Sequence, residues 1–569
     1  MNCKLPIGFD EGVSFIPITN LTINMKNVAK LIPSFLVKRC PKSGKIVRFR
    51  FDNVYAKIGF PLFGILAIIW FLMRVIPKPS RAAYPCQQVA VGLGSAFLVY
   101  LFGFWTSLTI YDKIRNKINK PVALGYLAVL AVVATVGYGI AKNATPGFIS
   151  NFMPPEGRNN PIGEAKGIFP GRVVWTQDFD ATSWDGKTGT WWDDNNTSQV
   201  VTDKMISETL KNVTGEKTDK KSWQKLFEYS NLHAGSGKKG YKKGEKILIK
   251  INMNPVGKLD AEWLDKGYPS PQMLNSLVKQ LVEVASVSCE DIVISDPSRF
   301  INGPIVEKIR GNKSKGFENI VFEVKEAPNF AGFRSAEPDS SASALVWFVM
   351  PDGSKYKMCF PKSFSEATYI INYTVVRPHR VFGITSAAKN HFGSVWDFKQ
   401  KAFNPSTLHA FALWDYPTPN KMNDAHSAPV LLGHHITSSK TILYLADGLY
   451  TAISQTGSVK RMSTFNNDWF SSLLMSQDPV ALESVVYDFI ASEPNLVSGN
   501  PSFNGNQDNQ FHECALANNP PSGTKYDPEN DGTGLTSLGV HEHWNNAKDR
   551  LYSRNMGKNI GIELITIRN

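Results

Sequence analysis

The pattern of hydrophobic and polar positions differs between two parts of the chain. The N-terminal part has long apolar runs without charge, whereas the rest of the chain has short apolar segments. Three apolar runs without a charged residue lie at residues 58–73, 89–111 and 121–141. A bilayer core of about 30 Å needs about 20 apolar residues per helix, so these runs predict three transmembrane α-helices. A buried helical hairpin is the alternative, but three such runs so close together favour a membrane region.

From residue 246 onward, short apolar strands alternate with amphipathic helical patterns. Leu274, Leu277 and Leu281 have helical spacing within residues 273–285, and residues 305–310 predict a short helix. The predicted strands are residues 246–252, 291–296, 319–324, 367–372 and 441–447. Strands that alternate with helices favour a mostly parallel sheet with flanking helices. The predicted fold class is therefore α/β, in a large soluble domain that follows the three transmembrane helices.

This pattern divides the chain into four segments. Residues 1–57 form a basic cytoplasmic N-terminal segment, and residues 58–142 form the three-helix membrane region. Residues 143–245 are rich in Trp, Gly and Asn, and residues 246–569 form the α/β domain with a C-terminal extension. A chain of 569 residues is long enough for one large domain with such additional segments.

The net charge of +13 is concentrated at the start of the chain. Residues 1–142 have 18 Lys and Arg against 4 Asp and Glu, whereas residues 143–569 have 44 against 45. The neutral remainder argues against nucleic acid as a partner. Basic residues are dense before the first apolar run and in residues 112–120, which places both on the cytoplasmic side. The sequence thus predicts a multi-pass protein of the bacterial inner (cytoplasmic) membrane, with the lipid bilayer as a partner and residues 143–569 as a periplasmic domain.

Polar side chains stand at the ends of several predicted strands. They are Lys250, Asn252, Asn254, Asp296, Asn372 and Asp447. In open α/β sheets, ligands bind outside the carboxyl ends of the strands. We therefore expect Lys250, Asn252 and Asn372 to bind a substrate there, and Asp447 to bind a metal ion or orient a ligand. Helix capping and turn formation are the alternative roles for such Asn and Asp residues.

A second group of candidate residues lies within residues 362–393. Arg377 and His379 follow a predicted strand, and Lys389 and Asn390 lie on a predicted helix shortly afterwards. Lys389 offers a point charge and Arg377 a planar fork to an anion, and His379 can act in general acid–base catalysis. We expect His379 and Lys389 to be catalytic, with Arg377 and Asn390 binding a small anionic substrate. Capping and structural hydrogen bonds are the alternative.

The C-terminal part contains a candidate metal site. On a strand, alternate residues share a face, so His541 and His543 can bind one metal ion. A third ligand would come from His512 or Glu513. The remaining candidate metal ligands are Asp447 and Asp478.

The six cysteines form no CxxC pair. Neither a zinc ribbon nor a cysteine-ligated iron–sulfur cluster is therefore indicated. The cofactor stays unknown, with a divalent metal ion as the candidate.

Two motifs resemble those of an uncharacterised bacterial family called "domain of unknown function 362", over roughly residues 246–490. The family's middle motif runs Lys-x-His, then Thr, then Lys-Asn-x-x-Gly, and its late motif runs Ser-x-Asp-Pro-Val-Ala followed by an acid. The corresponding residues here are Arg377, His379, Thr385, Lys389, Asn390, Gly393, Ser476, Asp478, Pro479, Val480, Ala481 and Glu483. Arg377 and Glu483 replace the family's Lys and Asp and keep the charge.

The resemblance implies an α/β fold and supplies no established reaction. Many family members carry ferredoxin-like cysteine motifs, which this chain lacks. The leading hypothesis is an enzyme that acts on a small anionic substrate with a divalent metal ion. The alternative is a non-catalytic module that binds a ligand or a partner at the membrane surface. Protein partners and oligomeric state do not follow from the sequence.

Overall fold

The computed structural model describes residues 37–39, 46–49, 156–254, 256, 265–312, 316–350, 353–403, 408–409, 422–498 and 508–569. The chain divides into two compact units, residues 1–141 and 142–569. In the first unit, β1 (Val37–Arg39) pairs with β2 (Ile46–Phe49) in antiparallel orientation.

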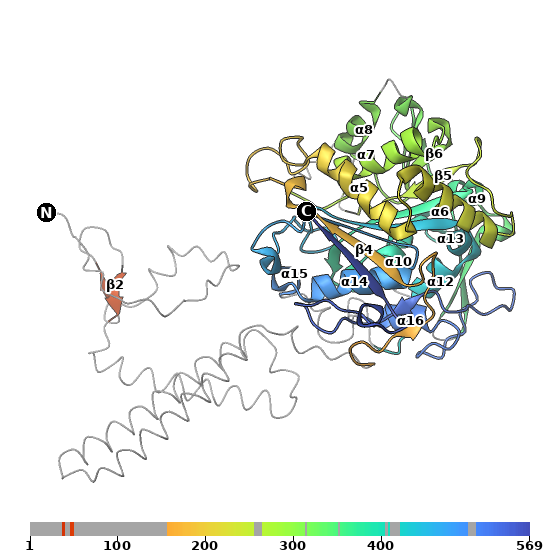
Figure 1. Ribbon diagram of the computed structural model, residues 1–569. Coiled ribbons are helices and arrows are strands. Elements are labelled where there is room, and N and C mark those ends of the chain that lie inside the picture. Colours follow the sequence, from red (N-terminus) through yellow and green to blue (C-terminus); the bar gives the residue numbers. More distant parts are fainter. Residues whose placement is uncertain are drawn as a thin grey trace, which may run out of the picture. The chain divides into compact units, whose positions relative to one another are not determined.

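A nine-stranded sheet runs through the second unit (Figure 1). Its spatial order is β19-β4-β17-β16-β11-β5-β6-β7-β8. The strands are β4 (Arg172–Gln177), β5 (Ile247–Lys250), β6 (Ile292–Asp296), β7 (Val321–Val324), β8 (Phe333–Ser335), β11 (Tyr369–Val375), β16 (Thr441–Gly448), β17 (Ser472–Ser476) and β19 (Glu563–Arg568). β17 is antiparallel to both of its neighbours, and the other neighbouring pairs are parallel. The sheet is therefore mixed.

The α/β part of the predicted fold is confirmed. The five predicted strands correspond to β5, β6, β7, β11 and β16. The predicted helices correspond to α7 (Pro271–Lys279), which continues as a π-helical segment, and to α8 (Gly303–Arg310). The antiparallel strand β17 was not predicted, and neither were β4, which comes from the Trp-rich segment, and β19, which comes from the C-terminal extension.

Helices cover both faces of the sheet because each buried strand is apolar on both sides. Along β5, Ile247 and Ile249 pack into one hydrophobic cluster, whereas Leu248 packs into another on the opposite face. The first face is covered by α5 (Gln199–Thr214), α6 (Asp219–His233), α7 and α8. The opposite face carries α9 (Lys362–Glu366), α10 (Ala387–Asn390), α12 (Ser427–Gly433), α13 (His435–Lys440), α14 (Pro479–Ala491) and α16 (Asn509–Ala515).

Three smaller β structures complete the unit. An antiparallel sheet is formed by β9 (Leu345–Val349), β10 (Lys355–Cys359), β14 (Trp396–Asp397) and β15 (Ala402–Phe403). A hairpin joins β12 (Arg377–His379) and β13 (Gly383–Thr385). β3 (Ile162–Gly163) pairs with β18 (Val540–His541), which brings the two ends of the unit together.

The chain changes direction across the sheet at β5. The strands β6, β7 and β8 follow β5 on one side, whereas β11 and β16 lie on its other side. In open α/β sheets, such a reversal leaves a crevice at the carboxyl ends of the strands, where ligands bind. The topology therefore points to the ends of β5, β6 and β11 as the place for a site.

The structure corrects the prediction of a membrane protein. Among the residues that the structure describes, no helix is long and apolar enough to cross a membrane. The longest of them, α5, has 16 residues, whereas a bilayer core needs about 20 apolar ones. The apolar runs in residues 58–142 lie outside the described residues. We withdraw the three transmembrane helices, the multi-pass anchoring and the inner-membrane location with a periplasmic domain.

Asp478 joins three segments of the second unit. Its carboxylate accepts hydrogen bonds from the backbone N–H groups of Lys166 (2.8 Å), Ala481 (2.9 Å) and Val540 (3.2 Å). The Ala481 bond caps α14, and the other two hold both ends of the unit against this helix. The position predicted as a metal ligand therefore has its oxygens occupied by backbone donors.

We expect Asp478→Ala to lower the free energy of unfolding by about 3 kcal/mol or more, because three backbone donors lose their acceptor. Ser198 caps α5 through one bond, from the Val201 N–H, so Ser198→Ala should cost only about 1 kcal/mol. Denaturant unfolding of both variants measures the difference. If both variants lose the same free energy of unfolding, Asp478 does not hold the three segments together as described.

Candidate functional site

A cavity of about 110 Å³ lies at the ends of β5 and β6, where the topology places a crevice. It is lined by Lys250, Asn252, Asn254, Asp296, Ser298, Arg299, His379, Thr385, Lys389, Asn390, Phe392, Gly393 and His409. The structure thus brings together five of the predicted residues: His379, Lys389, Lys250, Asn252 and Asn390. A larger cavity of about 300 Å³ lies elsewhere, and none of the predicted site residues lines it.

Asn390 fixes the helix α10 at the ends of two strands. Its amide nitrogen donates to the Lys250 carbonyl (2.9 Å), to Asn372 Oδ1 (2.8 Å) and to the Tyr373 carbonyl (3.2 Å). Its own Oδ1 accepts from Lys250 Nζ at 3.1 Å. A fully bonded, buried amide of this kind allows one position for α10 relative to β5 and β11.

Asn372 lies behind the cavity and does not line it. Its amide nitrogen donates to the Ala387 carbonyl and lies 2.9 Å from His391 Nε2. Burial lowers the pKa of His391 to about 3, so this ring is neutral at physiological pH. The predicted substrate contact of Asn372 has no support in this geometry, because its amide is used to hold Asn390 and His391.

Lys389 reaches the cavity as a buried amine. Its side chain is 7% exposed, and Nζ lies 2.9 Å from His409 Nε2 and 3.9 Å from the ring centroid of Phe392. Among the described residues, its partners include no carboxylate. Burial, together with the charges of Arg299 and Arg377, holds the pKa of Lys389 well below its usual value.

His379 and His409 lie side by side at the same cavity. Their rings stack with centroids 5.5 Å apart, and His379 Nδ1 accepts the backbone N–H groups of Val381 (3.1 Å) and Phe382 (3.3 Å). The neutral His379 ring therefore carries its proton on Nε2. Burial and the neighbouring Lys389 hold the pKa of His379 well below its usual value.

Two further cations line the cavity from the sheet side. Lys250 is fully buried, and its Nζ lies 3.7 Å from Asp296 Oδ1. Burial lowers the pKa of Lys250, although the charge of Asp296 opposes this shift. Arg299 donates from Nη2 to Asn254 Oδ1 at 2.7 Å. The described residues that line the cavity thus include two lysines, one arginine and two imidazoles against one carboxylate, Asp296.

Arg377 lies behind the cavity and is a positioning residue. Its Nη1 donates to the Gly267 carbonyl at 2.5 Å, and its Nη2 donates to Asn252 Oδ1. Asn252 in turn lines the cavity. The geometry therefore assigns Arg377 the role of positioning Asn252, in place of the predicted contact with a substrate.

Glu483 connects the late motif to the middle motif. Its Oε1 accepts the backbone N–H of Ala388 at 2.9 Å, next to Lys389 on α10. Gly393 is required nearby, because a Cβ atom at this position would collide with Ser298 Oγ. The two sequence motifs thus build one local structure around the cavity.

Asp447 is not part of the cavity. Its Oδ2 accepts hydrogen bonds from the Ser270 N–H (2.7 Å) and the Tyr373 hydroxyl (2.7 Å), and its Oδ1 accepts from the Leu449 N–H (3.1 Å). Asp447 therefore does not line the cavity that His379 and Lys389 share.

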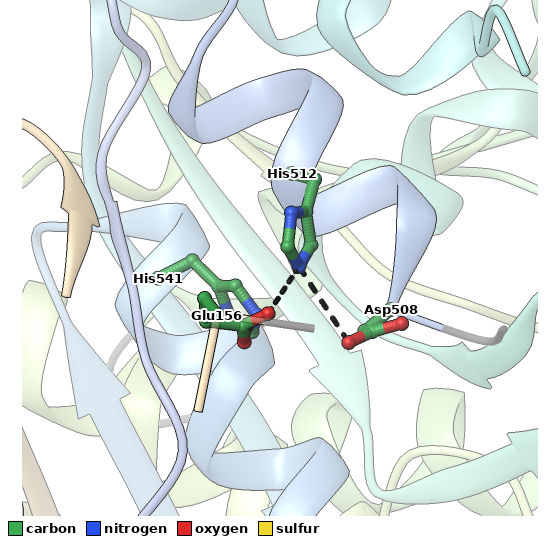
Figure 2. Close-up of side chains that lie close together, drawn as sticks. All are labelled: Glu156, Asp508, His512 and His541. Atoms are coloured by element: carbon green, nitrogen blue, oxygen red, sulfur yellow. Dashed lines mark ion pairs between the residues drawn. The ribbon is translucent and has the colours of Figure 1, made fainter. Parts of the chain in front are cut away.

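His541 lies in a second, separate cluster (Figure 2), and His543 Nε2 lies 3.5 Å from Glu156 Oε1 of the same cluster. Ligand atoms of Glu156, Asp508, His512 and His541 all lie within 4.8 Å of one another. Of the two predicted third ligands, His512 belongs to this cluster. The other, Glu513, binds Ser522 and Tyr526.

The charges in this cluster act on one another. Burial raises the pKa of Glu156, but His512 and His541 outweigh burial and lower it below the usual range. Burial lowers the pKa of His512, but Asp508 and Glu156 raise it to about 9. The cluster thus holds carboxylates and imidazoles in strong mutual contact away from solvent.

The sequence analysis missed residues that only long-range folding brings to these sites. Arg299 and Ser298 follow β6 within three residues of Asp296, so the strand-end argument extends to them. His409, Glu156 and Asp508 carry no local signal: each stands in a stretch without a motif.

The comparison with known families supports the middle and late motifs. The family model described as "Domain of unknown function (DUF362)" matches residues 247–488. The resemblance over roughly residues 246–490 is therefore confirmed: this region of the chain matches the DUF362 family model. No curated protein matches the chain. The family description names no reaction, so the function has to be argued from the site.

We expect Glu483→Gln to stabilise the protein at neutral and higher pH. Burial raises the pKa of Glu483 from 4.5 to about 8, so the folded protein binds a proton that the unfolded chain releases. Stability therefore falls as pH rises from 4.5 to about 8, and the loss is complete above pH 8. Gln keeps the acceptor for Ala388 without the charge, so the gain above pH 8 should be at least about 1 kcal/mol.

Glu493→Gln is the matched control, measured by thermal unfolding across the same pH range. Hydrogen bonds from Thr464 and Ser463 outweigh burial and lower the pKa of Glu493, so its charged form is the stabilising one. This variant should lose stability at neutral pH. A loss for Glu483→Gln as well would show that the Glu483 carboxylate is charged in the folded protein.

Proposed function

We propose that the cavity at the ends of β5 and β6 binds a small molecule with an oxyanion group, a carboxylate or a phosphate, and that it carries out acid–base chemistry on this molecule. The observation that carries the proposal is the Lys389 amine, which is buried at the cavity beside His409 with no carboxylate among its described partners. A buried amine without a counterion becomes charged at low cost only when an anion binds next to it.

The charge around the cavity supports this choice of ligand. Lys250 is partly neutralised by Asp296, whereas Arg299 adds a positive charge at the cavity and Lys389 can gain one when an anion binds. Arg299 presents a guanidinium group, which suits the planar or tetrahedral oxygens of a carboxylate or phosphate. The small volume, about 110 Å³, restricts the part of the ligand that enters to a few heavy atoms.

The imidazoles provide the chemistry. His409 Nε2 lies 2.9 Å from Lys389 Nζ, so a proton can pass between the two groups. His379 stacks on His409 and keeps its Nε2 proton, because its Nδ1 accepts two backbone N–H groups. Burial holds the pKa of Lys389 well below its usual value, which favours the uncharged amine as a base, whereas the neutral His379 ring can donate its Nε2 proton. The site therefore has a base and a donor next to the place of the anion.

We expect Lys389→Met to abolish the binding of inorganic phosphate while leaving stability within about 1 kcal/mol of the wild type, or above it. The methionine fills the same apolar space against Phe392, and no carboxylate among the described residues loses its partner. Isothermal titration calorimetry with phosphate and with acetate measures binding and separates the two oxyanion classes.

Lys460→Met is the matched control, because this lysine is exposed on the same unit. It should bind phosphate as the wild type does. The proposal fails if the wild type binds neither phosphate nor acetate, or if Lys389→Met binds them as tightly as the control. A loss of several kcal/mol in the stability of Lys389→Met would instead assign Lys389 a structural role.

A further inference from the structure

The second cluster, formed by Glu156, Asp508, His512, His541 and His543, has the composition of a metal site. Its members come from three parts of the chain: the segment before β3, the helix α16 with the residue before it, and β18 with the residues after it. Figure 2 shows the side chains of Glu156, Asp508, His512 and His541 converging on one another. His543 joins them through its Nε2 atom.

The distances between the polar atoms match the spacing of ligands around one ion. His512 Nε2 lies 3.0 Å from Glu156 Oε2 and 3.6 Å from Asp508 Oδ2. His541 Nε2 lies 3.2 Å from Glu156 Oε1, and His543 Nε2 lies 3.5 Å from the same oxygen. Two ligands that are each about 2.1 Å from a metal ion lie about 3.0 Å apart at a right angle and about 3.4 Å apart at a tetrahedral angle.

Several of these atoms are buried without a hydrogen bond. Among the described residues, none completes a hydrogen bond with either carboxylate oxygen of Glu156 or with the Nε2 atoms of His512 and His541. The side chains are at least nine-tenths buried: Glu156 is 5% exposed and His541 is fully buried. A buried carboxylate without donors is costly unless a cation neutralises it.

The opposite nitrogen of two of the rings is held by one helix. On α14, Ser484 Oγ lies 2.8 Å from His541 Nδ1, and Asp488 Oδ1 lies 2.6 Å from His543 Nδ1. Ser484 and Asp488 are four residues apart, so they lie on the same face of α14. Metal-binding histidines characteristically have such a partner, which fixes the tautomer and leaves Nε2 as the ligand atom.

We propose that a divalent first-row transition metal ion binds at this cluster, with the Nε2 atoms of His512, His541 and His543 and the carboxylates of Glu156 and Asp508 as ligands. Three imidazoles with two carboxylates and no sulfur suit manganese, iron, cobalt or zinc and do not suit magnesium or calcium, which prefer oxygen ligands alone. The ion is structural: it ties Glu156 and β18 at the two ends of the unit to α16.

The proposal does not rest on the proposed function, because the two sites share no residue. Metal content of the purified full-length chain, measured by elemental analysis after exhaustive dialysis, should be about one ion per chain. Glu156→Gln and His541→Ala should each lower it at least about tenfold, and Asp488→Asn should weaken the affinity of the site by about 10–100-fold. His233→Ala replaces an exposed histidine and should keep the full content.

A titration of the chelator-treated wild type with Co²⁺ gives a test that does not depend on the folding of a variant. One equivalent of Co²⁺ should produce the ligand-field absorption of a site with nitrogen and oxygen ligands and raise the melting temperature. Unfolding on chelation that added Zn²⁺ or Co²⁺ reverses also supports the site. The proposal is overturned if the folded, chelator-treated chain takes up neither ion, or if Glu156→Gln and His541→Ala keep the wild-type metal content.

Discussion

The geometry of the candidate site depends on one buried amide, the side chain of Asn390. It binds the Lys250 carbonyl on β5 and Asn372 on β11, and it accepts the Lys250 amine. These bonds hold α10 at the point where the chain changes direction across the sheet. The residue before Asn390, Lys389, therefore lies at the strand ends. Without this amide, neither the position of Lys389 nor the partner of Lys250 would be determined.

This arrangement buries basic side chains, which is unfavourable unless their charge is compensated or lost. The cavity and the cluster around Glu156 deal with buried charge in different ways. Among the described residues of the cavity, one carboxylate, Asp296, faces two lysines and an arginine, so the unbound site favours neutral forms of Lys389 and His379. At the cluster around Glu156, carboxylates and imidazoles are closely matched and enclosed. The cavity therefore suits a ligand that binds reversibly, and the cluster around Glu156 suits a permanently bound ion.

The sequence predicted the parts of the structure that local pattern determines. Short apolar runs located β5, β6, β7, β11 and β16, and the rule that ligands bind at strand ends selected Lys250 and Asn252. The crowding of cationic and imidazole side chains within residues 362–393 selected His379, Lys389 and Asn390. The rule failed for Asp447, because a strand-end carboxylate also serves as an acceptor for backbone and hydroxyl groups. Glu156 could not be found, since it meets His541 only through the pairing of β3 with β18. Hydropathy alone suggested a membrane region, which the helices of the described residues do not support.

The central claim is that Lys389 is a buried amine with no carboxylate among its described partners, and that a bound anion supplies the missing charge; the pKa of Lys389 tests this claim most directly. Nuclear magnetic resonance of protein labelled with ¹³C at the lysine ε carbon can follow this one amine, with Lys389→Met to assign its signal. The account predicts a pKa well below the usual value of a lysine amine, and a clear rise when phosphate or acetate is added. An ordinary lysine pKa that neither anion changes would contradict it.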